Sequence, residues 1–409
     1  MNSRPNGRPF FFAPGPTNIP DRILGAMNKP AVDFLAPEFL AVHARVHAGI
    51  KKVLKTKQHL FIYSANGHGA WEAALANTLS PGDKVLSLES GYFSANWAAM
   101  AEELGLVVET LPADWRTGVG QAAMVKRLKA DSANEIKAIL VAHNETATGV
   151  STPLSEVRNA LNQAEHKGLL FADTISSLGS FDFQMDAWGV DIVVGGSQKG
   201  LMMTTGLSFT GVSDRALELS KQIKTRRSYW NWADMLTRQP QKFPGTTPVH
   251  MFFGLDESLA MIEAEGLDAV FRRHRRFANA TRAAISHWGG GGPASGATVS
   301  EAGIKGSIKA LELVCTDPKR MSDSVSAVFT PDGHDANALR SVAQSRFNLT
   351  LGGGLGPLNG RVFRIGHMGD LNEPMMLGAL ATLELAFKTV KIPHIAGGVD
   401  AAIKALLDA

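Results

Sequence analysis

Short apolar runs alternate with longer helical patterns through the first half of the chain. The apolar runs, which predict strands, lie at residues 59–63, 84–90, 106–112, 136–143, 168–173 and 191–196. The helical patterns between them lie at about 70–79, 96–105, 124–130 and 154–168. This alternation predicts βαβ units and therefore a fold of the α/β class, in which helices flank a buried, mostly parallel sheet.

A second set of patterns follows a polar and aromatic stretch near residue 240. One long helical pattern runs from about Phe252 to His287. The remainder alternates strand, helix, strand and helix at 325–331, 335–347, 361–367 and 375–390. We therefore expect a large domain of residues 21–265 and a smaller C-terminal α/β domain of residues 266–409, joined by the long helix.

The first twenty residues differ from the rest of the chain. They hold five prolines and two glycines, and proline is excluded from helix interiors and from central strands. Residues 1–20 are therefore expected to form an extended arm, which packs on the protein through Phe10, Phe11 and Phe12.

Composition narrows the class of protein. With 409 residues, 44% hydrophobic and 19% charged, and a net charge of +3, the chain is not of the disordered type. The 41 basic and 38 acidic side chains nearly balance, so no nucleic-acid partner is expected. We also expect no membrane span and no secretory signal. Together with the single cysteine, these features favour a soluble, cytoplasmic protein.

Two residues at predicted strand ends are candidates for catalysis. Lys199 follows the run 191–196, where open α/β sheets bind ligands and where burial makes a lysine nucleophilic. A solvated turn lysine is the other interpretation. Asp173 ends the preceding strand; alone it is more simply a helix cap. Together they match the needs of pyridoxal phosphate, a Schiff-base lysine and an anion that keeps the pyridine nitrogen protonated.

A glycine-bearing turn is the third element. Asn66 to Gly69 opens a helix, and the free amide groups and dipole at a helix N-terminus bind phosphate. The turn is neither a Walker loop nor a dinucleotide fingerprint. Ser197 and Gln198, beside the lysine, add donors for the same phosphate. Capping of the helix alone would also explain Asn66.

These motifs carry a family resemblance. The chain resembles the class V, fold-type I pyridoxal phosphate aminotransferases, most of all the serine–glyoxylate and alanine–glyoxylate group. The matching segments are spread over nearly the full length, at 11–23, 66–85, 143–150, 171–180, 195–200 and 352–372. Their number and order make the resemblance specific.

The resemblance implies a role for each matching cofactor position. Lys199 is implied to be the Schiff-base lysine and Asp173 the partner of the pyridine nitrogen. Phe93 falls where an aromatic ring stacks on the cofactor, and Thr146 falls where a hydroxyl or backbone group contacts the phenolic oxygen. The positions that match phosphate binding are Asn66, Gly67, His68 and Gln198.

Two further residues extend the implied site. Thr246 matches a residue that reaches the phosphate from the other subunit, which implies a homodimer with composite active sites. Arg364 matches the arginine that binds the substrate α-carboxylate, a task that suits a guanidinium with its two parallel hydrogen bonds. Without the resemblance, a surface ion pair would be the simpler interpretation of Arg364.

The implied reaction is transamination from serine or alanine to a 2-oxo acid, above all glyoxylate, which becomes glycine. The alternative is another pair, with aspartate or pyridoxamine as donor and glyoxylate or pyruvate as acceptor. A desulfurase-type lyase is disfavoured, because Gln198 stands where those enzymes place histidine and Cys315 reads as a buried apolar residue. A non-catalytic ligand-binding protein on an α/β fold would bind no cofactor.

Three segments depart from the pattern of the glyoxylate group. Asp33-Phe34-Leu35 stands where Asp-His-Arg is expected, Thr204-Thr205-Gly206 where Pro-Pro-Gly is expected, and Gly245-Thr246 where Tyr-Thr is expected. The first and third are expected to touch the substrate mouth, so the amino donor stays open. No metal is expected, because His43 and His47 are four residues apart but lack the acid of an HExxH motif.

Overall fold

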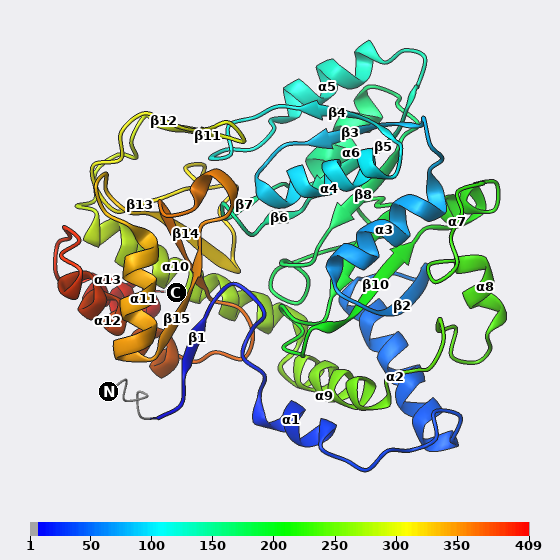
Figure 1. The fold of residues 1–409 in the computed structure, drawn as a ribbon, viewed down its shortest axis with the longest axis horizontal. Helices are drawn as coiled ribbons and strands as arrows, with labels where there is room; N and C mark the ends of the chain where they lie inside the picture. The colour runs from blue at the N-terminus through cyan, green and yellow to red at the C-terminus, as the bar shows by residue number, and fades with distance from the viewer. Residues whose placement is uncertain (1–6, 409) are drawn as a thin grey trace.

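The larger of two main sheets forms the centre of the protein in this computed structural model, which describes residues 7–408. Residues 1–6 of the predicted arm lie outside the described residues. The sheet has the strand order β2-β10-β9-β8-β5-β3-β4 (Figure 1). Its strands are β2 (His59–Ala65), β3 (Lys84–Leu88), β4 (Val107–Leu111), β5 (Ile136–Ala142), β8 (Leu169–Asp173), β9 (Ile192–Gly196) and β10 (Gly206–Val212). β10 runs antiparallel to both neighbours, and the other pairs are parallel, as the sequence predicts.

Helices bury both faces of this sheet, which explains why its strands read as continuous apolar runs. On one face lie α2 (Pro37–Val53), α5 (Gln121–Ala130), α6 (Leu154–Gln163) and α9 (Val249–Glu265). On the other lie α3 (Gly67–Thr78), α4 (Tyr92–Glu103), α7 (Asp214–Ser220) and α8 (Trp232–Thr237). Successive strand residues alternate between the two cores: Leu170 packs in the first and Phe171 in the second.

A second sheet has the order β1-β15-β16-β14-β13. Its strands are β1 (Phe10–Phe12), β13 (Glu312–Leu313), β14 (Val325–Phe329), β15 (Leu349–Gly353) and β16 (Val362–Gly366). Helices α10 (Leu267–Trp288), α11 (Ala336–Phe347), α12 (Glu373–Thr389) and α13 (Gly398–Leu407) pack with it around one core. The arm contributes β1 as an edge strand parallel to β15, and Phe12 is buried in that core.

The remaining elements are short. They are α1 (Asp21–Met27), β6 (Asn144–Glu145), β7 (Val150–Ser151), β11 (Thr298–Ser300), β12 (Gly303–Lys305) and the 3₁₀ turn η1 (Gly356–Leu358). Among the described residues, no helix is both long enough and apolar enough to cross a membrane.

The expectation of one long helix over 252–287 is wrong. Gly266 is both the C-cap of α9 and the N-cap of α10, and its φ of +85° is not helical, so the pattern is divided into two helices. A residue with a side chain rarely adopts this backbone conformation. Strands β10, β13 and β15 are not among the predicted elements, because they are short or carry glycine and polar residues among their apolar positions.

Candidate active site

Lys199 lies in the turn that follows β9, at the C-terminal edge of the parallel strands. Its side chain is buried, and Nζ donates a hydrogen bond to the carbonyl of Pro14. Burial, and then the positive charge of Arg364, lower the pKa of Lys199 from 10.5 to about 7, although the Asp173 carboxylate opposes the shift. Lys199 is therefore not a solvated turn lysine, and much of its amine is neutral at neutral pH.

Asp173 is the last residue of β8, the strand next to β9. Its carboxylate is buried and accepts hydrogen bonds from Trp71 Nε1 at 3.1 Å and from the backbone amide of Ile175 at 2.7 Å. Burial raises the pKa of Asp173 to about 7, while these two donors and Lys199 act in the opposite direction. A cationic partner would favour the charged form of this carboxylate.

The turn after β2 begins α3 as predicted. The Asn66 side chain caps the helix by accepting from the amides of His68 at 3.1 Å and Gly69 at 3.4 Å. A Cβ on Gly67 would lie 2.2 Å from Ile175 Cδ1, so the helix start packs tightly on the residues that follow Asp173. The predicted capping by Asn66 is therefore present at this turn.

One cavity of about 250 Å³ brings most of the predicted site residues together. Those that line it are Asn66, Gly67, His68, Phe93, Thr146, Asp173, Gln198 and Lys199. Gln198 also has a buried Oε1 with no hydrogen-bond partner among residues 7–408. The cavity thus combines a buried amine, a buried carboxylate, a helix N-terminus and an unsatisfied amide oxygen.

Three predicted residues do not line this cavity. Ser197 is buried, and its hydroxyl donates a hydrogen bond to the protein backbone. Arg364, on β16 of the second sheet, is buried beside it and donates from Nε to Gly353 O at 2.7 Å and from Nη1 to Thr146 O at 3.0 Å. It is not a surface ion pair. Thr246 is exposed in the segment between α8 and α9.

Sequence reasoning missed several residues that line the cavity: Gly15, Pro16, Trp71, Asn144, Ile175, Ser176 and Thr205. The two arm residues come from the Pro-Gly-Pro segment, where a Cβ on Gly15 would lie 2.3 Å from Lys199 Cδ. The many prolines of the arm predict an extended backbone, but they do not predict which part of the protein the arm contacts. Trp71 sits in a helix-forming stretch that gives no hint of its bond to Asp173.

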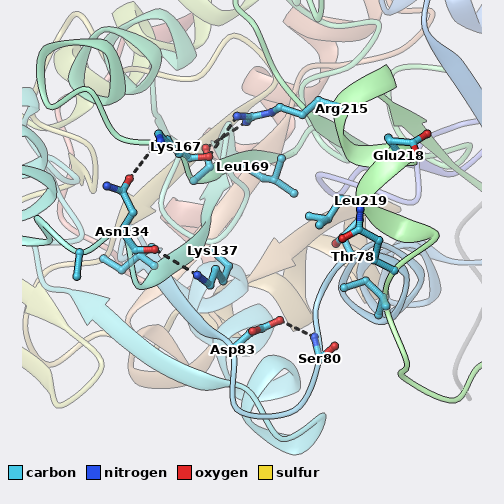
Figure 2. Close-up of a pocket in the computed structure, with 15 residues that line it drawn as sticks. Thr78, Ser80, Asp83, Asn134, Lys137, Lys167, Leu169, Arg215, Glu218 and Leu219 are labelled. Carbon is cyan, nitrogen blue, oxygen red and sulfur yellow. Dashed lines mark hydrogen bonds between the residues drawn. The ribbon is translucent and has the colours of Figure 1, made fainter.

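A second cavity, of about 910 Å³, lies at the opposite edge of the larger sheet and contains none of the predicted site residues (Figure 2). Several of its polar groups bind one another or the nearby backbone. Lys137 Nζ donates to Asn134 O, the Lys167 amide donates to Asn134 Oδ1, and Arg215 donates to Lys167 O. Because Arg215 also pairs with Asp191, its charge is already compensated.

Comparison with known proteins decides the family. The family model described as aminotransferase class-V matches residues 10–292. The chain belongs to the class V aminotransferases. It is 42% identical to the L-aspartate–glyoxylate aminotransferase of Paracoccus denitrificans, over 96% of this chain and 94% of the relative. It is 44% identical to the serine–glyoxylate aminotransferase of Hyphomicrobium methylovorum, over 93% of this chain and 90% of the relative.

Solved structures of aminotransferases share the fold. The pyridoxamine–pyruvate aminotransferase of Mesorhizobium loti has a TM-score of 0.86 at 26% identity and covers all of both chains. The alanine–glyoxylate aminotransferase of Nostoc sp. has a TM-score of 0.82 at 27% identity, over 94% of this chain and 96% of that one. The predicted fold-type I class is confirmed, and the chain is an aminotransferase.

Proposed function

We propose that this class V aminotransferase uses pyridoxal phosphate to transfer the amino group of serine or alanine to glyoxylate, which gives glycine. The observation that carries the proposal is the single cavity in which buried Lys199 and buried Asp173 lie with the N-terminus of α3. Relatives named serine–glyoxylate aminotransferase support the choice of glyoxylate.

The residues of the cavity fit this cofactor. The start of α3 and the side chain of Gln198 suit the phosphate, because the positive end of the helix dipole and the Gln198 amide nitrogen would attract an anion. Phe93 offers a flat ring, and Asp173 offers an anion for the pyridine nitrogen. When bound, pyridoxal phosphate would draw electrons from the substrate Cα and carry the amino group between the two substrates.

Lys199 and Asp173 would act on two different protons. With a pKa of about 7, about half of Lys199 Nζ is a free amine at neutral pH. The lysine therefore suits a general base that takes the proton from the substrate Cα. Asp173, once a cation lies against it, would stay ionised and hold a proton on the pyridine nitrogen. Its bonds to Trp71 and the Ile175 amide fix the carboxylate in place.

Arg364 is proposed to bind the substrate carboxylate. Its Nε and one Nη1 hydrogen are used by Gly353 O and Thr146 O, and guanidinium has five N–H donors. The remaining donors are therefore available for a carboxylate. The two backbone bonds hold the guanidinium in one orientation, which reduces the entropy lost when the substrate binds.

We also propose a homodimer in which Thr246 reaches the partner's phosphate. Thr246 and Gly245 are exposed and lie outside the chain's own cavity, which supports this proposal. Gln241 donates to Phe34 O and so ties the 33–35 segment to the same loop. Two of the three sequence departures thus lie close together, where they would face the substrate mouth of the partner.

Spectroscopy tests the cofactor. Purified protein mixed with pyridoxal phosphate should show a bound visible absorbance band that is absent in Lys199→Ala. A wild-type protein without such a band would rule out the proposed cofactor.

A panel of single amino donors tests the substrate. Serine or alanine, added alone to the holoenzyme, should change the visible band as the amino group is transferred. The relatives named for aspartate and pyridoxamine make these two compounds the informative competitors. If aspartate or pyridoxamine changes the band while serine and alanine leave it unaltered, the proposed donor is wrong and the alternative pair replaces it.

A further inference from the structure

Glu145 is a fully buried carboxylate that has no part in the chemistry above. It ends β6, immediately before Thr146, and the residue is 0% exposed. The nearest backbone leaves little space around it, since a Cβ on Gly91 would lie 2.5 Å from Glu145 Cγ. A charged group in such a place is costly unless its hydrogen bonds are satisfied.

One carboxylate oxygen holds the start of α4. Glu145 Oε2 accepts from the backbone amides of Phe93 and Ser94, each at 3.0 Å. The residue before α4 is Gly91, which has no side chain to cap these amides. The carboxylate therefore takes the place of an N-cap and meets the positive end of the helix dipole. It also fixes the backbone from which the Phe93 ring lines the cavity.

The other carboxylate oxygen holds the turn after β6. Glu145 Oε1 accepts from the Ala147 amide at 3.0 Å, and the backbone oxygen of Glu145 accepts from the Gly149 amide at 2.9 Å. Thr146 lies within this turn, and its carbonyl accepts from Arg364 Nη1. The placement of the guanidinium thus depends on a turn that Glu145 closes.

Charge adds to these contacts. Burial lowers the pKa of Arg364 to about 10, and the Glu145 carboxylate acts against that shift. Burial, together with the nearby Asp173, raises the pKa of Glu145 to about 7, while the three amide donors favour its ionised form. Two other charged groups act in this part of the protein: Lys199, which faces Arg364 and Asp173, and Arg340, which lies near Arg364.

We propose that Glu145 is a positioning residue, which holds the Phe93 ring and the Thr146–Arg364 pair in one arrangement for the cofactor and the substrate carboxylate. The proposal rests on the proposed function. In this proposal, Glu145 aligns α4, which packs on the larger sheet, with Arg364 of the second sheet.

The test compares Glu145→Gln with a matched control, Asp131→Asn. Asp131 is also a buried carboxylate that accepts two backbone amides, those of Glu135 at 3.2 Å and Ile136 at 2.9 Å. It precedes β5, at the sheet edge opposite the cavity. Glutamine keeps the shape of Glu145 but turns an NH₂ group toward amide donors. It therefore loses either the Ala147 bond or the Phe93 and Ser94 bonds, according to its orientation.

Three measurements read the outcome. In Glu145→Gln holoenzyme we expect KM for the amino donor to rise ~10-fold or more and the visible circular dichroism of the bound cofactor to change. In the protein without cofactor, hydrogen exchange should accelerate in at least one of the segments 92–97 and 145–149, the one that loses its bonds to residue 145. Asp131→Asn should loosen only its own region and leave KM and the dichroism as in wild type.

Each result has one meaning. Wild-type KM and dichroism in Glu145→Gln, or exchange that stays as in wild type at both segments, would overturn the positioning role. Equal changes in Asp131→Asn would also overturn it, because the effect would then be general destabilisation. Failure of the proposed function shows separately, as wild-type protein that binds no cofactor, and the role of Glu145 falls with it.

Discussion

The reactivity of Lys199 depends on its burial and on two charges that act on its pKa in opposite directions. The positive Arg364 lowers this pKa and the negative Asp173 raises it, on top of the larger effect of burial. Both neighbours come from other strands, Asp173 from β8 and Arg364 from β16. The pKa of Lys199 therefore depends on charged side chains from both sheets.

This arrangement predicts opposite pH shifts in two variants. The rate at which the protein without cofactor binds pyridoxal phosphate covalently should rise with pH, with a midpoint near 7, because only the neutral amine attacks. Removing the positive charge in Arg364→Ala should move the midpoint to higher pH, and Asp173→Asn should move it to lower pH. Stopped-flow absorbance between pH 5 and about 10 measures both midpoints.

Arg364→Lys is the control for charge. It keeps a positive charge at the position, so its midpoint should stay closer to wild type than that of Arg364→Ala. Midpoints that move in the same direction in Arg364→Ala and Asp173→Asn would contradict the electrostatic account of Lys199.

The cavity residues that could be predicted from sequence share a physical reason. Lys199 and Asp173 follow apolar strands, and Asn66 precedes a helix, so local pattern places all three at one edge of a sheet. Pro14 and Trp71 could not be found in this way, because their contacts with Lys199 and Asp173 depend on how distant segments pack. The contact of Glu145 with the start of α4 has no local signal either, since Phe93 and Ser94 lie about fifty residues away in the sequence.

At the scale of elements, glycine decides where helices stop. Gly266 separates α9 from α10 with a φ of +85°. Apart from its chain neighbours, no residue of 7–408 would have an atom within 4 Å of a Cβ at this position, so the space beside it is open. Any cost of a side chain there is therefore a cost in backbone conformation and not in packing.

We expect Gly266→Ala to lower the free energy of unfolding by ~1–2 kcal/mol, the cost of holding a residue with a Cβ in this region. Gly120→Ala is the matched control, because Gly120 also has open space but a φ of −78°. Urea unfolding followed by far-ultraviolet circular dichroism measures both. Equal losses in the two variants would show that the backbone at Gly266 is not the cause.

The same glycine explains the error in the predicted helix. Apolar spacing continues across residues 252–287, and a single glycine in a helical pattern is tolerated at a modest cost, so the pattern alone indicates one helix. The two helices pack mainly in different cores, α9 against the larger sheet and α10 with the second sheet. Strands such as β5 and β9 are predicted correctly, because burial on both faces requires apolar residues along the strand and this run is visible in the sequence.

For the whole molecule, the arm links the two sheets. β1 pairs with β15, and a few residues later the Pro14 carbonyl accepts from Lys199. A Cβ on Gly366 of β16 would lie 2.6 Å from Ala13 O, so the arm also packs closely on the strand that carries Arg364. Contacts across this sequence distance have no local pattern, which is why they escape prediction.

The proposed composite site predicts that two inactive proteins restore activity when they form a hybrid. Lys199→Ala lacks the lysine in both of its sites. Thr246→Arg, with a bulky side chain on an exposed residue, should fold normally but block the partner's phosphate position, so it should also be inactive. In a hybrid dimer, one site would receive Lys199 from one chain and Thr246 from the other, both intact.

The hybrid dimers can be made by co-expressing the two variants with different affinity tags and purifying the protein through both tags. Such hybrids have one intact site of two, so we expect about half of the wild-type specific activity if the sites act independently. Each parent protein purified alone is the control. Inactive hybrids, or a Thr246→Arg protein that is active by itself, would contradict the composite site, because a loop that serves only its own chain cannot separate the two defects.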